Sequence, residues 1–191
     1  MRSHFFRLVP FTVPGVPHGT LPASLEIEIT GTIALEAAAL DVIYCINGAN
    51  ERVKYAHAGA QPSRKNELWR TTCFELFMKL PGGSEYWEVN LAPSRDWNMY
   101  RFTGYRSTLQ PELMVDNINI ATEITPPRLV SLRATLPLPL SVVNQKLAIG
   151  ISSVIEDGDG NLHYFALRHC GLKPDFHDPA GFDIILDPAP L

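Results

Sequence analysis

The chain has 191 residues, a formal net charge of −4 and 46% hydrophobic residues, so it can bury a core of its own. Its basic residues are scattered, and Arg64 and Lys65 form the only adjacent basic pair, which argues against the basic surface that a nucleic-acid backbone requires. No segment approaches the length of a membrane span, so we expect neither nucleic acid nor a membrane as a partner.

Cysteine usage points to a reducing compartment. Cys45, Cys73 and Cys170 make an odd count without C-x-x-C spacing, which argues against a disulfide framework and a thiolate zinc site. Near the start of the chain, Arg7 and Pro10 interrupt the apolar run that a secretory signal needs. We therefore expect a cytoplasmic protein with free thiols. No repeat or low-complexity linker divides the sequence, and this predicts one domain over residues 1–191 with its core at about 25–186.

Alternation of apolar and polar residues with a period of two recurs along the chain and predicts β-strands. It first covers residues 25–30. The alanine-rich segment 35–40 that follows fits a helix or a strand, and both remain open. Further strand patterns cover residues 72–80, 85–91, 117–120, 130–136, 146–154, 162–167 and 182–186. Turn sequences rich in proline, glycine and aspartate separate these runs. The expected fold is all-β, an antiparallel β-sandwich with at most one short helix.

One hairpin can be read in register. A Pro-Gly-Gly-Ser loop at residues 81–84 separates two strand patterns, and a simple hairpin closed there pairs Phe77 with Glu88 and Glu75 with Asn90. Successive side chains then point to opposite faces. One face is apolar and predicts core: Phe74, Leu76, Met78, Trp87, Val89 and Leu91. The other face is polar and aromatic: Glu75, Phe77, Lys79, Tyr86, Glu88 and Asn90.

The polar and aromatic face has the composition of a sugar site. Ring faces stack on the C–H patches of a pyranose, while carboxylates and amides bond its hydroxyl groups. Trp97 and Tyr100 follow the hairpin near a strand end, where binding loops gather. A sheet face covered by a loop, with Trp97 closing the bottom of the sandwich, would explain the same residues, and we keep that alternative.

Two segments resemble a known family. Residues 68–77 (LWRTTCFELF) are similar to the "LW…FELF" strand of DOMON-like domains related to family 9 carbohydrate-binding modules. Residues 90–100 (NLAPSRDWNMY) look like the N-x-[SA]-P-S-x-x-W-x-x-Y segment of the bacterial DOMON-like subgroup, which Tyr105, Arg106 and residues 174–177 (PDFH) also match. The resemblance spans about residues 25–186.

The resemblance implies an antiparallel β-sandwich that binds sugars in some relatives and haem in others. For family 9 modules it implies a sugar held between aromatic rings with acidic and amide partners. Trp69, Glu75 and Asn90 are the positions that match best. A second stacking tryptophan is not placed, and Trp97 is the candidate for it. The bacterial subgroup itself implies no settled activity.

Two enzymatic or metal-dependent alternatives stay open. Glu75 and Glu88 would be diagonal neighbours on adjacent strands, a spacing that permits a glycosidase acid and its partner. His169, Asp175, His177 and Asp178 form a histidine and carboxylate cluster that could support a metal or an acid–base pair. In the plainer interpretation, His177 bonds a loop carbonyl or Asp175 and stiffens its loop.

Haem is a weaker alternative. It would need axial ligands such as Met99 or Met114 with His163 or His169, and no spacing selects such a set. We therefore expect no cofactor, with a structural metal and haem as weak alternatives.

Together these patterns predict a non-catalytic module that binds a small molecule, expected to be a saccharide. If Arg95, Arg106 and Arg168 converge at the site, the ligand could be acidic. A glycoside-acting enzyme and a structural or interaction domain are the alternatives, and the oligomeric state stays open. The predicted ligand-binding residues are Trp69, Glu75, Glu88, Asn90, Arg95, Trp97, Tyr100, Arg106, Arg168 and His177.

Overall fold

The computed structural model describes residues 3–12, 25–48, 51–57, 59, 61–125 and 128–188, and its regular elements are strands and three short 3-10 turns. The strands are β1 (Ser3–Pro10), β2 (Ile27–Leu35), β3 (Ala39–Gly48), β4 (Val53–Lys54), β5 (Cys73–Lys79), β6 (Tyr86–Leu91), β7 (Trp97–Phe102), β8 (Gln110–Pro111), β9 (Asn119–Thr125), β10 (Arg128–Pro137), β11 (Leu147–Asp157), β12 (Leu162–Ala166) and β13 (Ile184–Leu186). The 3-10 turns are η1 (Leu68–Arg70), η2 (Leu140–Val142) and η3 (Pro179–Gly181). Among these elements, no helix is long and apolar enough to cross a membrane.

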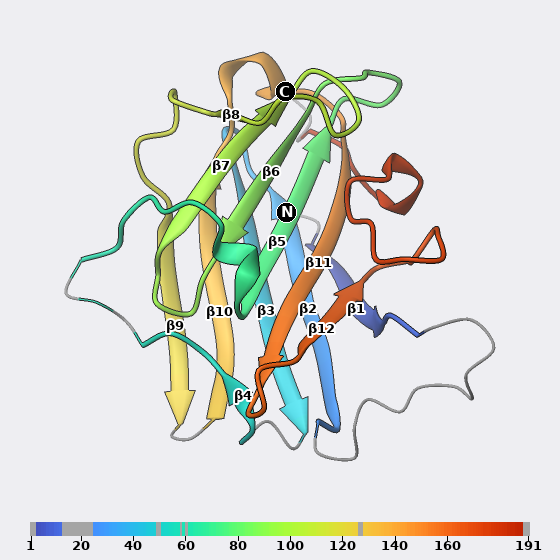
Figure 1. Ribbon diagram of the computed structural model, residues 1–191. Coiled ribbons are helices and arrows are strands. Elements are labelled where there is room, and N and C mark those ends of the chain that lie inside the picture. The colour runs from blue at the N-terminus through green and yellow to red at the C-terminus, as the bar shows by residue number, and fades with distance from the viewer. Residues whose placement is uncertain are drawn as a thin grey trace.

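The strands form a curled antiparallel sheet that folds back on itself as a sandwich (Figure 1). The strand order is β8-β7-β6-β5-β11-β12-β1-β2-β3-β10-β9, with β4 and β13 paired to β11. Strands β5, β6, β7, β11 and β12 make the front layer in Figure 1, and β2, β3, β10 and β9 make the back layer. β1 connects the layers, because its first residues pair with β2 while Val9 and Pro10 pair with β12.

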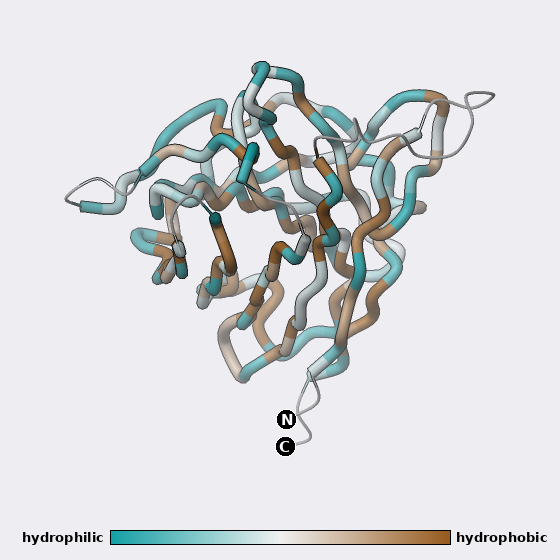
Figure 2. The backbone as a smooth tube through the Cα atoms, turned by 90° about the horizontal axis from the view of Figure 1, so that it is seen from below, coloured by the Kyte–Doolittle hydropathy of each residue, from teal (hydrophilic) through white to brown (hydrophobic). Residues whose placement is uncertain are grey.

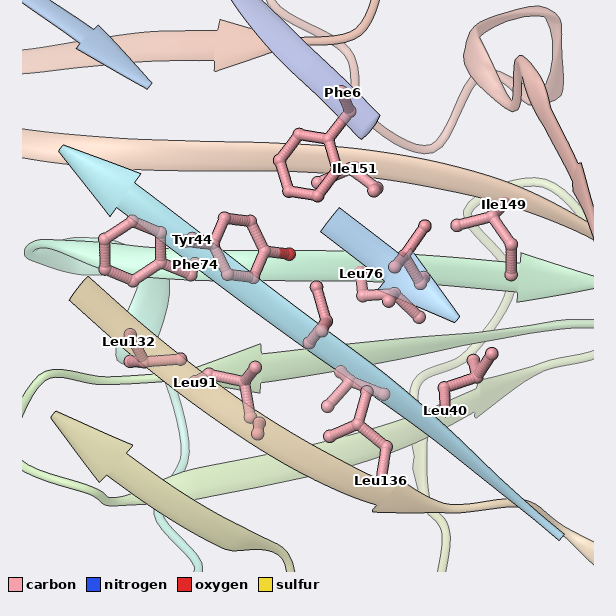
Figure 3. Close-up of a cluster of buried hydrophobic side chains, with 14 of the residues drawn as sticks. Phe6, Leu40, Tyr44, Phe74, Leu76, Leu91, Leu132, Leu136, Ile149 and Ile151 are labelled. Atoms are coloured by element: carbon pink, nitrogen blue, oxygen red, sulfur yellow. The ribbon is translucent and has the colours of Figure 1, made fainter. Parts of the chain in front are cut away.

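The main core lies between the two layers. Apolar residues alternate with polar ones along the strands, which is visible as repeated colour changes along the tube in Figure 2. Figure 3 shows Phe74, Leu76 and Ile151 of the front layer facing Tyr44 and Leu132 of the back layer. The Tyr44 hydroxyl is fully buried and donates to the backbone oxygen of Glu75 at 2.9 Å, which ties β3 to β5 across the core.

The predicted hairpin register is confirmed. Glu75 pairs with Asn90 and Phe77 with Glu88, and the six apolar side chains of the first face all lie in the core. A register shifted by one residue would have turned Glu75, Glu88 and Asn90 into the core. The segment 35–40, open between helix and strand, holds the end of β2, the turn to β3 and the first residues of β3, with the Glu36 amide donating to the Ala39 oxygen at 2.8 Å.

Candidate functional site

The face of the front layer that points away from the core is the outer face. It carries a second, smaller apolar cluster of buried side chains: Phe77, Tyr86, Tyr100, Phe102, Ala148 and Phe182. Trp69 of η1 and Phe176 of the loop after β12 pack against this cluster. The outer face is therefore covered in part by loops, as the alternative interpretation of the sequence expected.

A pocket of about 440 Å³ remains open between these loops and the outer face. We call it the outer pocket. Its walls come from η1, β5, β6, β7, β11, β12 and the loops that follow β7 and β12. Of the predicted site residues, five line it: Trp69, Glu75, Glu88, Arg106 and His177.

Aromatic rings border the outer pocket on two sides of Glu75. Trp69 packs edge-on against Tyr100 of β7, with ring centres 5.9 Å apart. Tyr164 lies on β12, two strands from β5 in the other direction, and its ring centre is 6.2 Å from that of Phe176. Rings placed on both sides of a polar floor suit a ligand with apolar faces and polar edges.

Glu75 of β5 lies on the floor of the outer pocket and is only 3% exposed. Its Oε2 accepts a hydrogen bond from the Ser152 hydroxyl of β11 at 3.0 Å. Burial raises the pKa of this carboxyl group well above its ordinary value, and the nearby charge of Glu88 raises it further. The Glu75 carboxyl group therefore tends to keep its proton near neutral pH.

Glu88 of β6 is the second acid of the floor, with 5% exposure. Its Oε1 accepts a hydrogen bond from the Asn90 amide at 2.6 Å, and its Oε2 lies 3.7 Å from Nε2 of His177. Burial raises the pKa of Glu88, although the Asn90 hydrogen bond and the charge of Arg106 oppose the rise. The floor thus holds two carboxyl groups that resist ionising together.

His177 is oriented by a chain of hydrogen bonds. The Arg106 amide donates to the Tyr86 hydroxyl at 3.2 Å, and that hydroxyl lies 2.8 Å from Nδ1 of His177. Burial and the nearby Arg106 charge lower the pKa of His177 to about 4, so the ring is neutral at physiological pH. In the neutral tautomer whose Nδ1 accepts from the Tyr86 hydroxyl, the ring proton lies on Nε2, 3.7 Å from Oε2 of Glu88.

The loop after β7 brings Arg106 to the rim. Arg106 adopts a left-handed backbone conformation (φ 47°), and its Nη2 lies 2.8 Å from Oδ1 of Asp175. The Tyr105 hydroxyl donates to the other oxygen of Asp175. These bonds lower the pKa of Asp175, and they join the loop after β7 to the loop after β12 beside the pocket.

The remaining predicted site residues do not line the outer pocket. Asn90 is fully buried beneath Glu88, and Tyr100 is 1% exposed behind Trp69. Trp97 packs in the main core, where Arg64 covers its ring. Of the three arginines only Arg106 lines the outer pocket, whereas Arg95 donates to the Gly59 oxygen and Arg168 pairs with Asp183.

Sequence reasoning missed three contributors to the site. Tyr164 and Phe176 supply its second aromatic side, and Ser152 bonds Glu75. Phe176 lies inside the PDFH segment that resembles the bacterial DOMON-like subgroup. Tyr164 and Ser152 lie on strands whose alternation was visible, but which strand pairs with β5 cannot be read from alternation alone.

Most of the candidate metal and haem ligands named from the sequence have other partners in the fold. The described residues contain no group of three or more His, Cys, Asp or Glu side chains placed to hold a metal ion. Nε2 of His169 bonds the Val9 oxygen at 3.0 Å, and Nε2 of His163 bonds buried Asp157 at 2.9 Å. Met99 is enclosed in the main core. Both candidate histidines are therefore engaged in the fold, whereas the side chain of Met114 is 74% exposed after β8.

No family model matches the chain, and no curated protein matches it. Among solved structures, a candidate carbohydrate-binding protein from Bacteroides uniformis ATCC 8492 is similar at a TM-score of 0.64 and 14% identity, over 97% of this chain and 86% of that one. A family 9 carbohydrate-binding module from Caldicellulosiruptor kristjanssonii, solved with cellotriose and with glucose, reaches a TM-score of 0.47 at 11% identity. That likeness covers 76% of this chain and is too weak to carry an argument. The comparisons support the expected sandwich fold, and the relation to DOMON domains stays a prediction.

Proposed function

We propose that the protein is a non-catalytic module that binds a carbohydrate in the outer pocket. The observation that carries this proposal is the pairing of a polar floor, Glu75 and Glu88, with aromatic rings on both sides. Rings take the C–H faces of a pyranose, and carboxyl groups bond its hydroxyls. The volume of about 440 Å³ suits one or two sugar units. The similar Bacteroides uniformis protein is itself named for carbohydrate binding, in agreement with this proposal.

Each lining residue has a role in the proposal. Trp69 stacks on one sugar face, while Glu75 and Glu88 accept or donate hydrogen bonds according to which of them holds the proton. His177 and Arg106 act as donors at the edge of the ligand. Asn90 acts from beneath, by orienting Glu88. A cytoplasmic location belongs to the same proposal, since all three cysteines are free.

The test is a saccharide panel measured by calorimetry and thermal shift on the wild-type protein and two variants. Trp69→Ala and Glu75→Ala are expected to weaken binding of the best saccharide at least tenfold, which is about 1.4 kcal/mol. Phe5→Ala is the matched control, because Phe5 is 70% exposed on β1 and does not line the outer pocket. Wild-type protein that binds no member of the panel, or variants that bind as well as wild type, would contradict the proposal.

A second candidate is a glycoside-acting enzyme that uses Glu75 and Glu88. It is favoured by one observation: the two carboxyl groups resist ionising together, which resembles an acid and its partner in one pocket. Hydrolysis of chromogenic glycosides separates the candidates. Turnover that disappears in Glu75→Gln while the folded state persists would assign the enzyme, whereas binding without turnover supports the non-catalytic module.

A further inference from the structure

The charges of the outer pocket do not cancel. Its two floor carboxyl groups, Glu75 and Glu88, are 3% and 5% exposed, and neither forms an ion pair with a lysine or arginine among the described residues. Oε2 of Glu75 is bonded by Ser152, while no donor within the described part of the chain bonds Oε1. Oε1 is not among the fully buried unpartnered atoms of the described residues, so it remains accessible and a ligand in the pocket can supply its donor.

The positive groups at the pocket are already engaged. Nη2 of Arg106 lies 2.8 Å from Asp175, and Nη2 of Arg70 lies 2.8 Å from Glu67. Each arginine together with its acid is neutral, so the pair of floor carboxyl groups sets the net charge. His177 adds none, since its buried ring is neutral at physiological pH. The negative floor would repel an acidic sugar. The acidic ligand that three converging arginines would have favoured is therefore disfavoured.

We propose that the ligand is an amino sugar whose protonated amine binds between Glu75 and Glu88. This inference rests on the proposed carbohydrate-binding function and specifies its ligand class. An ammonium group carries three donors, enough to bond the free oxygen of Glu75 and to approach Oε2 of Glu88. Its charge offsets the burial of both acids. The aromatic faces of Trp69 and Tyr164 also attract a cation held between them.

Binding of a cation is expected to release a proton. Burial and mutual repulsion raise the pKa of both floor carboxyl groups, so the empty pair retains a proton near neutral pH. An ammonium placed between them favours the doubly ionised pair. The surrounding charged groups are Arg106 and Asp175 on the rim loops, and Arg70 with Glu67 at η1. The other titratable neighbours are uncharged at that pH: Tyr44, Cys73, Tyr86, Tyr100 and His177.

Two β-1,4-linked trimers that differ only at C2 test the inference: cellotriose carries a hydroxyl group there, and the glucosamine trimer carries an amine. Calorimetry at about pH 6.5 and low ionic strength is expected to show the glucosamine trimer binding at least tenfold more tightly. Glu75→Gln and Glu88→Gln are each expected to remove that preference, so that each variant binds the two trimers with affinities within about threefold of one another. Glu85→Gln is the control, because it removes the same charge from a residue that bonds Arg101 outside the pocket.

The outcomes separate the two proposals. Equal or tighter binding of cellotriose by wild-type protein would overturn the amino-sugar inference and leave the carbohydrate-binding function standing. A preference for the amine that persists in both glutamine variants would also overturn it, because the amine would then bind elsewhere. Failure of the folded wild-type protein to bind either trimer or any other saccharide would overturn both. Proton release on binding, measured in buffers of different ionisation enthalpy, supports the inference only if Glu75→Gln abolishes it.

Discussion

The guanidinium group of Arg64 lies 4.2 Å from the centre of the Trp97 ring and covers it. The same side chain donates to the side chain of Asn98 at 2.9 Å and to the backbone oxygens of Glu112 and Val115 at 3.0 and 2.6 Å. Arg64 therefore joins the start of β7 to the segment after β8 and closes one end of the core. This arrangement explains why Trp97 is a core residue and does not line the outer pocket.

We predict that Arg64→Lys lowers the free energy of unfolding by about 1–3 kcal/mol. A lysine keeps the charge but loses the planar stacking on Trp97 and most of the donors, so backbone oxygens are left without partners. Urea denaturation measures the change. Arg133→Lys, on the exposed side of β10, is the control and is expected to change stability by less than about 0.5 kcal/mol. Equal stability of the Arg64 variant and the wild-type protein would contradict this account.

The sequence allowed the hairpin of β5 and β6 to be placed in register, because a four-residue turn and the two-residue period act locally. The function of Arg64 could not be read in the same way. Its acceptors lie 34 to 51 positions away, one on β7 and two in the segment after β8, which has no periodicity. The loops that cover the outer face, such as the one carrying Phe176, likewise follow no pattern that indicates where they fold back.

The two floor carboxyl groups predict a loss of stability with rising pH. Their folded pKa values lie above the unfolded value of about 4.3, so the folded state holds more protons and the stabilisation they give is lost as pH rises through the folded pKa. Between about pH 6.5 and 8.5 the free energy of unfolding is expected to fall by roughly 1–3 kcal/mol. Glu75→Gln is expected to flatten this slope and to stabilise the protein at the upper end.

Urea denaturation across the pH series checks this prediction. Glu85→Gln serves as the matched control, because Glu85 is bonded to Arg101 at the edge of the sheet and its loss should leave the slope unchanged. Stability that stays constant or increases from pH 6.5 to 8.5 in wild-type protein would show that the pair ionises freely in the folded state.

His177 predicts an effect on the acid side. Burial lowers its folded pKa to about 4, below the unfolded value of about 6.5, so the unfolded state takes up a proton first as pH falls through that window. His177→Gln is therefore expected to gain stability relative to wild type between pH 6.5 and 4.5, by roughly 1–3 kcal/mol at the lower end. The free energy of unfolding of the variant is compared with that of the wild-type protein at each pH. This difference cancels the effect of the floor acids, which stabilise both proteins as pH falls. A difference that does not change with pH, or that matches the exposed-residue control His4→Gln, would contradict the neutral ring.

The close approach of Gly150 and Phe182 yields the last prediction. Gly150 pairs with Phe77 on β5, and a Cβ at Gly150 would lie 2.7 Å from Cδ1 of Phe182. The ring centres of Phe182 and Phe77 are 5.8 Å apart. Gly150→Ala should push the Phe182 ring away from Phe77 and lower the free energy of unfolding by about 1–3 kcal/mol. Gly104→Ala is the control, because a Cβ there would meet no atom within 4 Å.

A double variant distinguishes this steric cause from a general intolerance of alanine in β11. Combining Gly150→Ala with Phe182→Leu removes part of the ring that the new methyl group would contact. If the clash is the cause, the losses in free energy of unfolding of the two single variants will add up to more than the loss in the double variant. The difference is expected to be at least about 0.5 kcal/mol. Additive losses would place the cost in the strand backbone. The same measurement bears on the outer pocket, because Phe182 supports Phe77, one of its lining residues.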